Sequence, residues 1–510
     1  MKNTAQLQDL KLGARPDGRT LLTAQWVLGH SDGQHRLYKG GEVVIEDGTV
    51  LFVGHSFSGD IARHIDLGNA LISPGLIDLD ALSDLDTTIL GIDHHPGWAK
   101  GRVWPKSYVD SGPYEMYSQA ELAFQKRFAF GQLLQNGITT AAPIASLFYR
   151  EWGETVAEFD AAADAAGDLG LRVYLSPAYR SGGMMLESPG KIVPVFNEQR
   201  GIQGLNDAVD YIARQNGRHN DLVRGMLAPD RVETCTAELL KRTQDAAREM
   251  DCKIRLHMAQ GQMEVETVRA LHGTTAPVWM NSHGLLNERI IAPHATNATD
   301  EDLTLYAQNN VSIIHCPLVS ARGGSTLQSF SSVKKRGINI AMGTDTTPPD
   351  MLMNLLIGLI TCRINDGTPE SIRCADLFDA ATLGGAKALG RDDLGRLQAG
   401  AKADIAVFAL DDTVMAPSID PITTLVTGGS GKVTKAVFVD GRLSMRYGEV
   451  AGIDMQAARI QAQAQYDRLI AKYPERSYNN PTVAEIFPPS YPLVENTSAK
   501  AGLQASGEEI

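Results

Sequence analysis

Cysteine is scarce in this chain, and its few copies follow no pattern that binds metal or forms disulfide bonds. The five cysteines are odd in number and widely spaced, and no CxxC motif occurs: they are Cys235, Cys252, Cys316, Cys362 and Cys374. Disulfide scaffolds and thiolate zinc sites both depend on clustered cysteines. The spacing therefore argues against either kind of structure.

Long apolar runs and an excess of positive charge are also missing. Residues 1–20 contain no apolar segment of the kind a signal peptide needs, and no run of roughly 18 apolar residues suits a transmembrane helix. Acidic residues number 60 against 47 lysines and arginines, a net charge of −13. This balance disfavours binding to nucleic acid or to anionic membranes. We expect a cytoplasmic protein that acts on a small-molecule substrate, with no nucleic-acid or membrane partner.

β-rich segments lie near both ends of the sequence. Residues 21–72 contain apolar runs on either side of the turn Glu46-Asp47-Gly48, a strong hairpin signal. Residues 397–450 have the same character. Each segment is too small to bury a core alone, so we predict that the two pair into one composite β-sandwich.

The middle of the chain alternates short apolar strands with helical segments, which is typical of an α/β barrel. The candidate strands are eight: 71–81, 139–142, 172–176, 223–228, 253–257, 289–292, 311–314 and 338–342. We therefore predict a distorted (β/α)8 TIM barrel beside the sandwich. The expected domains are 1–72 (first half of the sandwich), 73–395 (barrel), 396–450 (second half of the sandwich) and 451–510 (C-terminal helix and extended tail).

Side chains that can bind metal or carry protons follow four consecutive candidate strands. They are His257, His294, His315 and Asp345. In a parallel barrel the carboxyl ends of the strands meet at one face, where the active site lies. Imidazole and carboxylate are standard ligands of zinc and similar divalent ions. Such an ion would lower the pKa of a water molecule toward neutrality and polarise a scissile bond.

Motifs spread over nearly the whole chain resemble the amidohydrolase superfamily, and within it the cytosine deaminase-like and triazine hydrolase-like enzymes. The chain also resembles phenylurea- and thiocarbamate-hydrolysing enzymes. The matching segments are 72–78 (ISPGLID), 136–140 (NGITT), 257–259 (HMA), 294 with 299–302, 315–317 (HCP), 343–345 (GTD), 380–390, and 395–404.

The resemblance implies one divalent metal ion, with zinc expected and manganese, cobalt or iron as alternatives. It implies that His257 and Asp345 hold the ion and that His294 is a ligand or a catalytic partner. Asp345 would also be the general base that accepts a proton from the attacking water. A homo-oligomer, a dimer or a tetramer, is expected by analogy.

The chain departs from the family pattern on the first barrel strand. The family's His-x-His pair corresponds here to Asp80 and Leu82. Leucine cannot bind metal, but Asp80 can serve as an oxygen ligand, which suits manganese, cobalt or iron more than the usual site does. His94 and His95, in the long segment 83–118, are alternative replacements. Asp345 is expected to face Asp80 across the barrel.

A second departure concerns the proton shuttle. Deaminases of this group carry His-x-x-Glu, and here the glutamate position is Gln260, which can hydrogen-bond but cannot carry a proton. Asp230 replaces a histidine that relatives often place near the substrate. We predict substrate contacts from Gln260, Asp230, His315 and Trp98. Segment 83–118 is expected to cover the site or to pack between subunits.

Three functions remain open from the sequence. The first is metal-dependent hydrolysis of a non-peptide C–N bond in an amide, urea, carbamate or related small molecule. The second is hydrolytic deamination or dechlorination of a purine, pyrimidine or triazine ring. The third is a metal-free homologue that binds a ligand or only assembles, which the lost His-x-His pair motivates.

Overall fold

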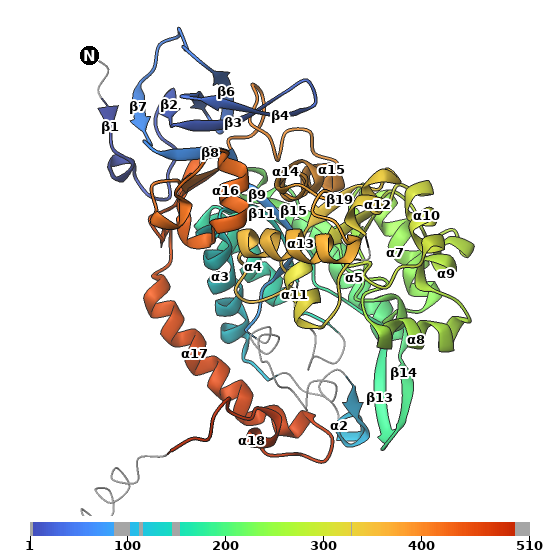
Figure 1. Cartoon of the computed structure of the whole chain (residues 1–510). Helices are drawn as coiled ribbons and strands as arrows, with labels where there is room; N and C mark the ends of the chain where they lie inside the picture. Colours follow the sequence, from blue (N-terminus) through green and yellow to red (C-terminus); the bar gives the residue numbers. More distant parts are fainter. Residues whose placement is uncertain (1–3, 86–102, 112–115, 145–152, 328, 495–510) are drawn as a thin grey trace, which may run out of the picture.

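Eight parallel strands form a nearly closed barrel at the centre of the computed structural model (Figure 1). Residues 4–85, 103–111, 116–144, 153–327 and 329–494 are described by the structure. Around the barrel the strand order is β19-β18-β17-β16-β15-β12-β11-β9. The strands are β9 (Leu76–Leu82), β11 (Ile138–Ile144), β12 (Arg172–Leu175), β15 (Val223–Leu227), β16 (Lys253–Arg255), β17 (Ile290–Pro293), β18 (Ser312–His315) and β19 (Ile340–Met342). The predicted fold class is confirmed.

The first and last barrel strands meet through hydrogen bonds made just beyond β19. The backbone N–H of Asp345 donates to the carbonyl oxygen of Asp80 at 2.8 Å. Thr344 donates from its backbone N–H and its hydroxyl to the Asp78 carboxylate, at 3.0 and 2.5 Å. Asp345 and Asp80 are therefore neighbours, and the expectation that they face each other across the barrel is wrong. Closure brings strand one beside strand eight.

Side chains alternate between the inside and the outside of the barrel, as they must along any strand. The interior is filled by Ile77, Leu79, Ala142, Tyr174, Met226, Ile291, Ile314, Cys316 and Ala341. The outward residues join a larger apolar core under the surrounding helices. Those helices include α3 (Gln119–Gln135), α4 (Val156–Leu169), α5 (Glu198–Gln215), α7 (Ala237–Glu249), α8 (Gln262–His272), α10 (Asp300–Gln308) and α13 (Met351–Asp366).

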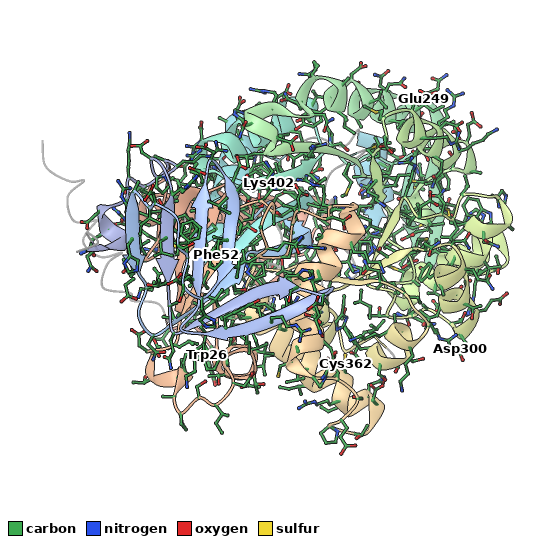
Figure 2. All side chains as sticks on the ribbon, turned by 90° about the horizontal axis from the view of Figure 1, so that it is seen from above. Trp26, Phe52, Glu249, Asp300, Cys362 and Lys402 are labelled. Carbon is green, nitrogen blue, oxygen red and sulfur yellow. The ribbon has the colours of Figure 1, made fainter. Side chains whose placement is uncertain are left out.

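Hydroxyl side chains start several of these helices. Ser118, Thr155, Thr236 and Thr299 each accept a hydrogen bond from a backbone N–H in the first turn, which satisfies a donor that the helix cannot pair internally. Seen from above, the helices bearing Glu249, Asp300 and Cys362 surround the barrel, and the sheet domain lies to one side (Figure 2).

The sheet domain combines strands from both ends of the chain. One sheet has five N-terminal strands in the order β1-β7-β2-β5-β6, and the other has seven in the order β23-β22-β21-β20-β8-β3-β4. In the second sheet β8 (Ala70–Pro74) pairs antiparallel with β20 (Ile405–Ala409). The remaining strands are β1 (Thr4–Ala5), β2 (Thr20–Thr23), β3 (Trp26–Ser31), β4 (Gln34–Lys39), β5 (Glu42–Glu46), β6 (Thr49–Gly54), β7 (Arg63–Asp66), β21 (Thr434–Val439), β22 (Arg442–Arg446) and β23 (Glu449–Val450).

The candidate strand 71–81 is two strands that belong to different sheets. β8 lies in the sheet domain and β9 in the barrel, with Gly75 between them. A Cβ atom on Gly75 would lie 2.1 Å from the Thr139 side chain, so only glycine allows this close approach of the barrel strand. The chain thus passes directly from one domain into the other.

A buried ion pair fastens the two domains together. Arg172, the first residue of β12, donates from Nε and Nη2 to the two carboxylate oxygens of Asp404, at 2.8 and 3.1 Å. Asp404 directly precedes β20 and also accepts a hydrogen bond from the backbone N–H of Asp440. The bidentate geometry sets the position of the barrel against the sheet domain.

Two segments outside the barrel strands and the two sheets also contain regular structure. Residues 177–203 include the hairpin β13 (Gly182–Ser188) and β14 (Lys191–Phe196), which pairs with β10 (Trp104–Pro105). After α17 (Met455–Lys472), the chain forms the short turns η7 (Tyr473–Arg476) and α18 (Val483–Ile486), so it is not simply extended. Ile486 packs with Tyr473 and Leu122 in a small apolar cluster. Among the described helices, none has the length and apolar character needed to cross a membrane.

Candidate metal centre

Three ligand-type side chains meet at the carboxyl ends of the barrel strands. Asp80 comes from β9, His257 follows β16 and His294 follows β17. Their ligand atoms all lie within 4.8 Å of one another, and all three residues are buried. Asp80 Oδ2 is 3.6 Å from His257 Nε2 and 3.7 Å from His294 Nε2.

Asp345 adds a fourth ligand-type group next to His294. Its Oδ2 lies 3.4 Å from His294 Nε2. Two atoms that each bind a tetrahedral zinc ion at about 2.1 Å lie about 3.4 Å apart, so the spacings among Asp80, His257 and His294 fit one divalent ion. Asp345 lies next to His294 but outside this group of three. Two imidazoles and two carboxylates are ligand types that zinc, manganese and cobalt all accept, so the ligand types do not choose between these ions.

The backbone at two of these residues is strained. His294 has φ of 73° and Asp345 has φ of 44°, both in the left-handed region. For residues other than glycine this region costs roughly 1–2 kcal/mol, and such strain clusters at functional sites. Hydrogen bonds hold both residues in place: the N–H of His294 donates to Ile314 O at 2.8 Å, and that of Asp345 donates to Asp80 O.

The imidazole of His257 is oriented by a backbone group. Its Nδ1 donates to the carbonyl oxygen of Asp230 at 3.1 Å, which leaves the Nε2 lone pair directed toward Asp80 and His294. Metal-binding histidines are commonly fixed in this way by a second interaction. Asp230 therefore reaches the site through its backbone as well as through its side chain.

Arg255 lies on the other side of Asp80 from the imidazoles. Its Nε is 3.8 Å from Asp80 Oδ1, and its Nη1 donates to the carbonyl oxygen of Ala142 at 2.7 Å. Asp80 Oδ1 has no hydrogen-bond partner among the described residues. Burial alone would raise the pKa of Asp80, but His257, Arg255 and His294 together lower it to about 2. Asp80 is thus an ionised carboxylate at neutral pH.

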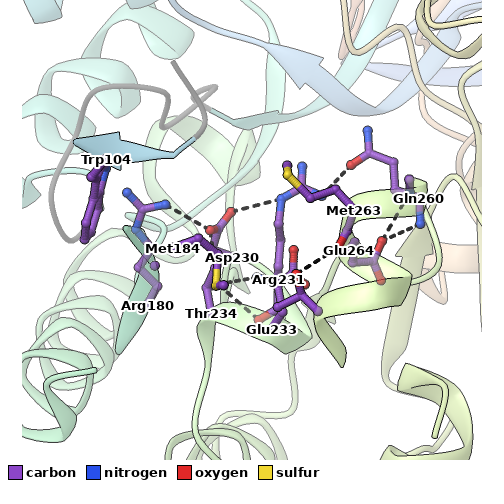
Figure 3. Close-up of a pocket in the computed structure, with 13 residues that line it drawn as sticks. Trp104, Arg180, Met184, Asp230, Arg231, Glu233, Thr234, Gln260, Met263 and Glu264 are labelled. Carbon is purple, nitrogen blue, oxygen red and sulfur yellow. Dashed lines mark hydrogen bonds and ion pairs between the residues drawn. The ribbon is translucent and has the colours of Figure 1, made fainter. Parts of the chain in front are cut away.

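A small cavity is lined by Asp230, whose backbone carbonyl holds His257 (Figure 3). Gln260 and Asp230, both predicted substrate contacts, line it. Arg231 donates a hydrogen bond to Gln260 Oε1, and Arg180 pairs with Asp230. Trp104 closes one side, with its ring 5.0 Å from the Arg180 guanidinium. The amide of Gln260, at the position predicted for a proton shuttle, thus lies at this cavity and is held by Arg231.

His315 does not reach this site. Along β18 the side chains of Ile314 and Cys316 face the barrel interior, so His315 between them faces outward, as alternation requires. Its ring packs against Phe330, its Nε2 lies 3.7 Å from Cys362 Sγ, and burial lowers its pKa to about 3. The predicted substrate contact of His315 is therefore corrected. Trp98, His94 and His95 lie outside the described residues.

The sequence interpretation missed three residues near the centre: Arg255, Arg231 and Glu233. Arg255 had a readable signal, because it precedes His257 by two residues on one strand and so faces the same way. After β15, Arg231 precedes and Glu233 lies in the short 3-10 helix η3 (Val232–Thr234), and no sequence pattern points their side chains into the cavity.

A parallel barrel with a histidine and aspartate cluster at the carboxyl ends of its strands defines the class as that of metal-dependent barrel hydrolases. The sequence model of the amidohydrolase family matches residues 71–444 of this chain. The chain belongs to the amidohydrolase family and is a hydrolase that acts on carbon–nitrogen bonds other than peptide bonds.

Relatives in sequence include two kinds of deaminase. A 5-methylthioadenosine/S-adenosylhomocysteine deaminase of Desulfitobacterium hafniense is 24% identical over 434 residues, which cover 83% of this chain and 93% of the relative. A 5'-deoxyadenosine deaminase of Methanothermobacter thermautotrophicus is 28% identical over 432 residues, with the same coverage of 83% and 93%.

Solved structures share the fold. An adenosine deaminase from Xanthomonas campestris with bound zinc has a TM-score of 0.72 at 20% identity, covering 88% of this chain and 98% of that one. A mutant of atrazine chlorohydrolase from Arthrobacter aurescens TC1, complexed with zinc and atraton, also has a TM-score of 0.72, at 23% identity and 88% and 99% coverage.

Proposed function

We propose that this protein hydrolyses a non-peptide C–N bond in a small amide, urea, carbamate or related molecule, with one zinc ion held by Asp80, His257, His294 and Asp345. The observation that carries the proposal is the set of spacings from 3.4 to 3.7 Å between these ligand atoms at the mouth of the barrel. The zinc bound in the two solved structures supports the choice of metal.

The chain's own residues divide the chemistry between them. The ion, when bound, lowers the pKa of a water molecule and polarises the substrate. Asp345 accepts the proton of the attacking water, and burial beside His294 keeps it within reach of that imidazole. Asp345 then gives that proton to the leaving nitrogen. Gln260 and the Asp230 side chain line the small cavity, where they contact the substrate.

Deamination or dechlorination of a purine, pyrimidine or triazine ring is the second candidate. The names of the relatives favour it. Gln260 weighs against it, because a side-chain amide bound by Arg231 cannot carry a proton to a ring nitrogen. Release of ammonia or chloride from a panel of such rings, with no turnover of ureas or amides, would establish this alternative in place of the first.

Two measurements test the main proposal. Elemental analysis of protein purified without added metal is expected to find one divalent ion per chain, with zinc the principal ion. Asp345→Asn is expected to lose turnover of ureas, amides and carbamates while keeping the circular dichroism spectrum of the parent. The control is Asp411→Asn, an exposed aspartate in the sheet domain.

Two results would contradict the main proposal. An active Asp345→Asn variant would overturn the role of that carboxylate. A protein that contains no metal and gains no activity with zinc, manganese or cobalt would be the metal-free binding homologue. Two expectations stay predictions: that the protein forms a homo-oligomer, a dimer or a tetramer, and that it is cytoplasmic. Analytical ultracentrifugation would test the first.

A further inference from the structure

The two oxygens of the Asp80 carboxylate face different partners. Oδ2 lies 3.6 Å from His257 Nε2 and 3.7 Å from His294 Nε2. Oδ1 lies 3.8 Å from Nε of Arg255. The carboxylate thus turns one oxygen toward the candidate metal centre and the other toward a guanidinium group.

The guanidinium of Arg255 is anchored to the wall of the barrel. Its Nη1 donates to the carbonyl oxygens of Ala142 at 2.7 Å and Pro143 at 3.4 Å, and its Nη2 also donates to Pro143 at 3.4 Å. Both carbonyls belong to β11, which pairs with the strand that bears Asp80. With both amino groups fixed to the backbone, Nε is the donor that remains directed at Asp80.

Asp80 and Arg255 balance each other's charge. Both side chains are buried, at 0% and 4% exposure, and a guanidinium stays protonated even in such a place. Asp80 stands where the family pattern has a neutral histidine, so the exchange adds one negative charge to the centre. Arg255 supplies one positive charge beside it, and the buried pair is retained as a unit.

The position of Arg255 restricts how Asp80 can bind a metal ion. A carboxylate binds a metal through one oxygen or through both. At 3.8 Å the contact between Nε and Oδ1 is an ion pair and not a hydrogen bond, so the constraint is one of charge. A divalent ion on Oδ1 would lie next to a fixed, buried cation, where water screens their repulsion weakly. Oδ2 is therefore the oxygen left for the ion.

We propose that Arg255 is a positioning residue that limits Asp80 to one ligand oxygen and thereby makes the centre prefer zinc to manganese more strongly than its ligand types alone would. The inference rests on the metal ion of the proposed function and deepens it. Zinc favours four ligands, whereas manganese favours six oxygen-rich ones, so a second oxygen from Asp80 would benefit manganese more. Arg255 acts on the metal through Asp80 and does not touch the substrate in this assignment.

The first test uses the parent protein and needs no variant. A crystal structure of the zinc-loaded protein, at a resolution that separates the two oxygens of a carboxylate, shows which of them binds the ion. We expect the ion on Oδ2 of Asp80, with Oδ1 still paired with Arg255. An ion bound by Oδ1, or by both oxygens, would overturn the proposal.

The second test measures metal preference in Arg255→Met. The dissociation constants for zinc and for manganese are determined by competition with a chelator. Loss of a nearby positive charge strengthens the binding of any cation, so the ratio of the two constants is the quantity that matters. We expect the preference for zinc over manganese to fall at least about tenfold. Arg172→Met is the matched control: it breaks a buried pair with Asp404 at the joint with the sheet domain and should keep the parent's ratio.

A conservative variant separates charge from folding. Arg255→Lys keeps a positive charge beside Oδ1 but loses the planar fork, and we expect it to retain most of the parent's preference for zinc. A preference as weak as that of Arg255→Met would overturn the proposal, as would an unchanged preference in Arg255→Met. If Arg255→Met does not fold, the lysine variant and the zinc-loaded structure still decide the question.

The outcomes also distinguish this inference from the proposed function. Neither the metal preference nor the crystal structure depends on turnover, so a failed hydrolysis assay counts against the proposed function alone. A parent that binds zinc through both oxygens of Asp80 and hydrolyses its substrate would overturn only the role of Arg255.

Discussion

The backbone N–H of Asp345 donates a hydrogen bond to the carbonyl oxygen of Asp80 at 2.8 Å. This one contact closes the barrel between its last and first strands. It also places two carboxylates beside His294, with Asp80 Oδ2 at 3.7 Å and Asp345 Oδ2 at 3.4 Å from its Nε2. Barrel closure and assembly of the candidate metal centre are therefore the same structural event.

Asp80→Asn tests the replacement of the family's histidine pair. An amide is a weaker ligand than a carboxylate, so we expect metal affinity to fall by at least about tenfold. The change also leaves Arg255 buried without its counter-charge, which costs roughly 3–5 kcal/mol. Metal titration and urea unfolding measure the two effects. Full metal content together with unchanged stability would show that Asp80 is not a ligand.

His294 and His315 should respond differently to the same substitution. His294→Asn removes a ligand-type group from the centre, and we expect loss of bound metal and of turnover. His315→Asn changes a ring that packs against Phe330 outside the barrel, and we expect full metal content with a loss of stability of about 1–3 kcal/mol. Elemental analysis and thermal unfolding of both variants decide the matter. Loss of metal from the His315→Asn variant would show that His315 contributes to the metal centre after all.

Arg172→Met tests the joint between barrel and sheet domain. The substitution leaves the buried carboxylate of Asp404 without its counter-charge. Breaking such a pair typically costs about 3–5 kcal/mol of stability. The double variant Arg172→Met with Asp404→Leu removes both charges and should recover part of that loss. Urea unfolding of the two singles and the double gives the coupling free energy. A coupling near zero would mean that the pair does not fasten the domains.

Glu233→Gln should alter how stability depends on pH. Because the pKa of Glu233 is raised from 4.5 to about 8, the folded parent binds more protons than the unfolded chain between these values. Its free energy of unfolding therefore falls as pH rises through this window, by up to about 1.4 kcal/mol per pH unit. Glutamine cannot titrate, so the variant gains stability relative to the parent from pH 4.5 to about 8 and no further above it.

The measurement is urea unfolding at several pH values. Glu249→Gln, an exposed glutamate at the end of α7, serves as the control and should follow the parent at every pH. Parallel curves for the parent and Glu233→Gln would show that Glu233 titrates normally.

Local patterns in the chain were enough to predict the elements and the identity of the reactive groups. Apolar runs between helical segments predicted the barrel, and the residues after those runs gave His257, His294 and Asp345. Strand periodicity also indicates that Arg255, two positions before His257, faces the same way as that histidine. These signals are local, because strand ends, caps and alternation depend on neighbours in the chain.

Which of these groups meet depends on how the whole barrel packs and closes. Asp80 and Asp345 are far apart in sequence and became neighbours when the barrel closed. His315 turned outward because of its register on β18, and Arg231, Glu233 and Gln260 came together from two separate loops. Distances between such residues are set by packing and closure of the whole barrel, which no local pattern records. The exchange of histidine for Asp80 could be read from the sequence, but its partner Arg255 and the charged cavity became visible only in the fold.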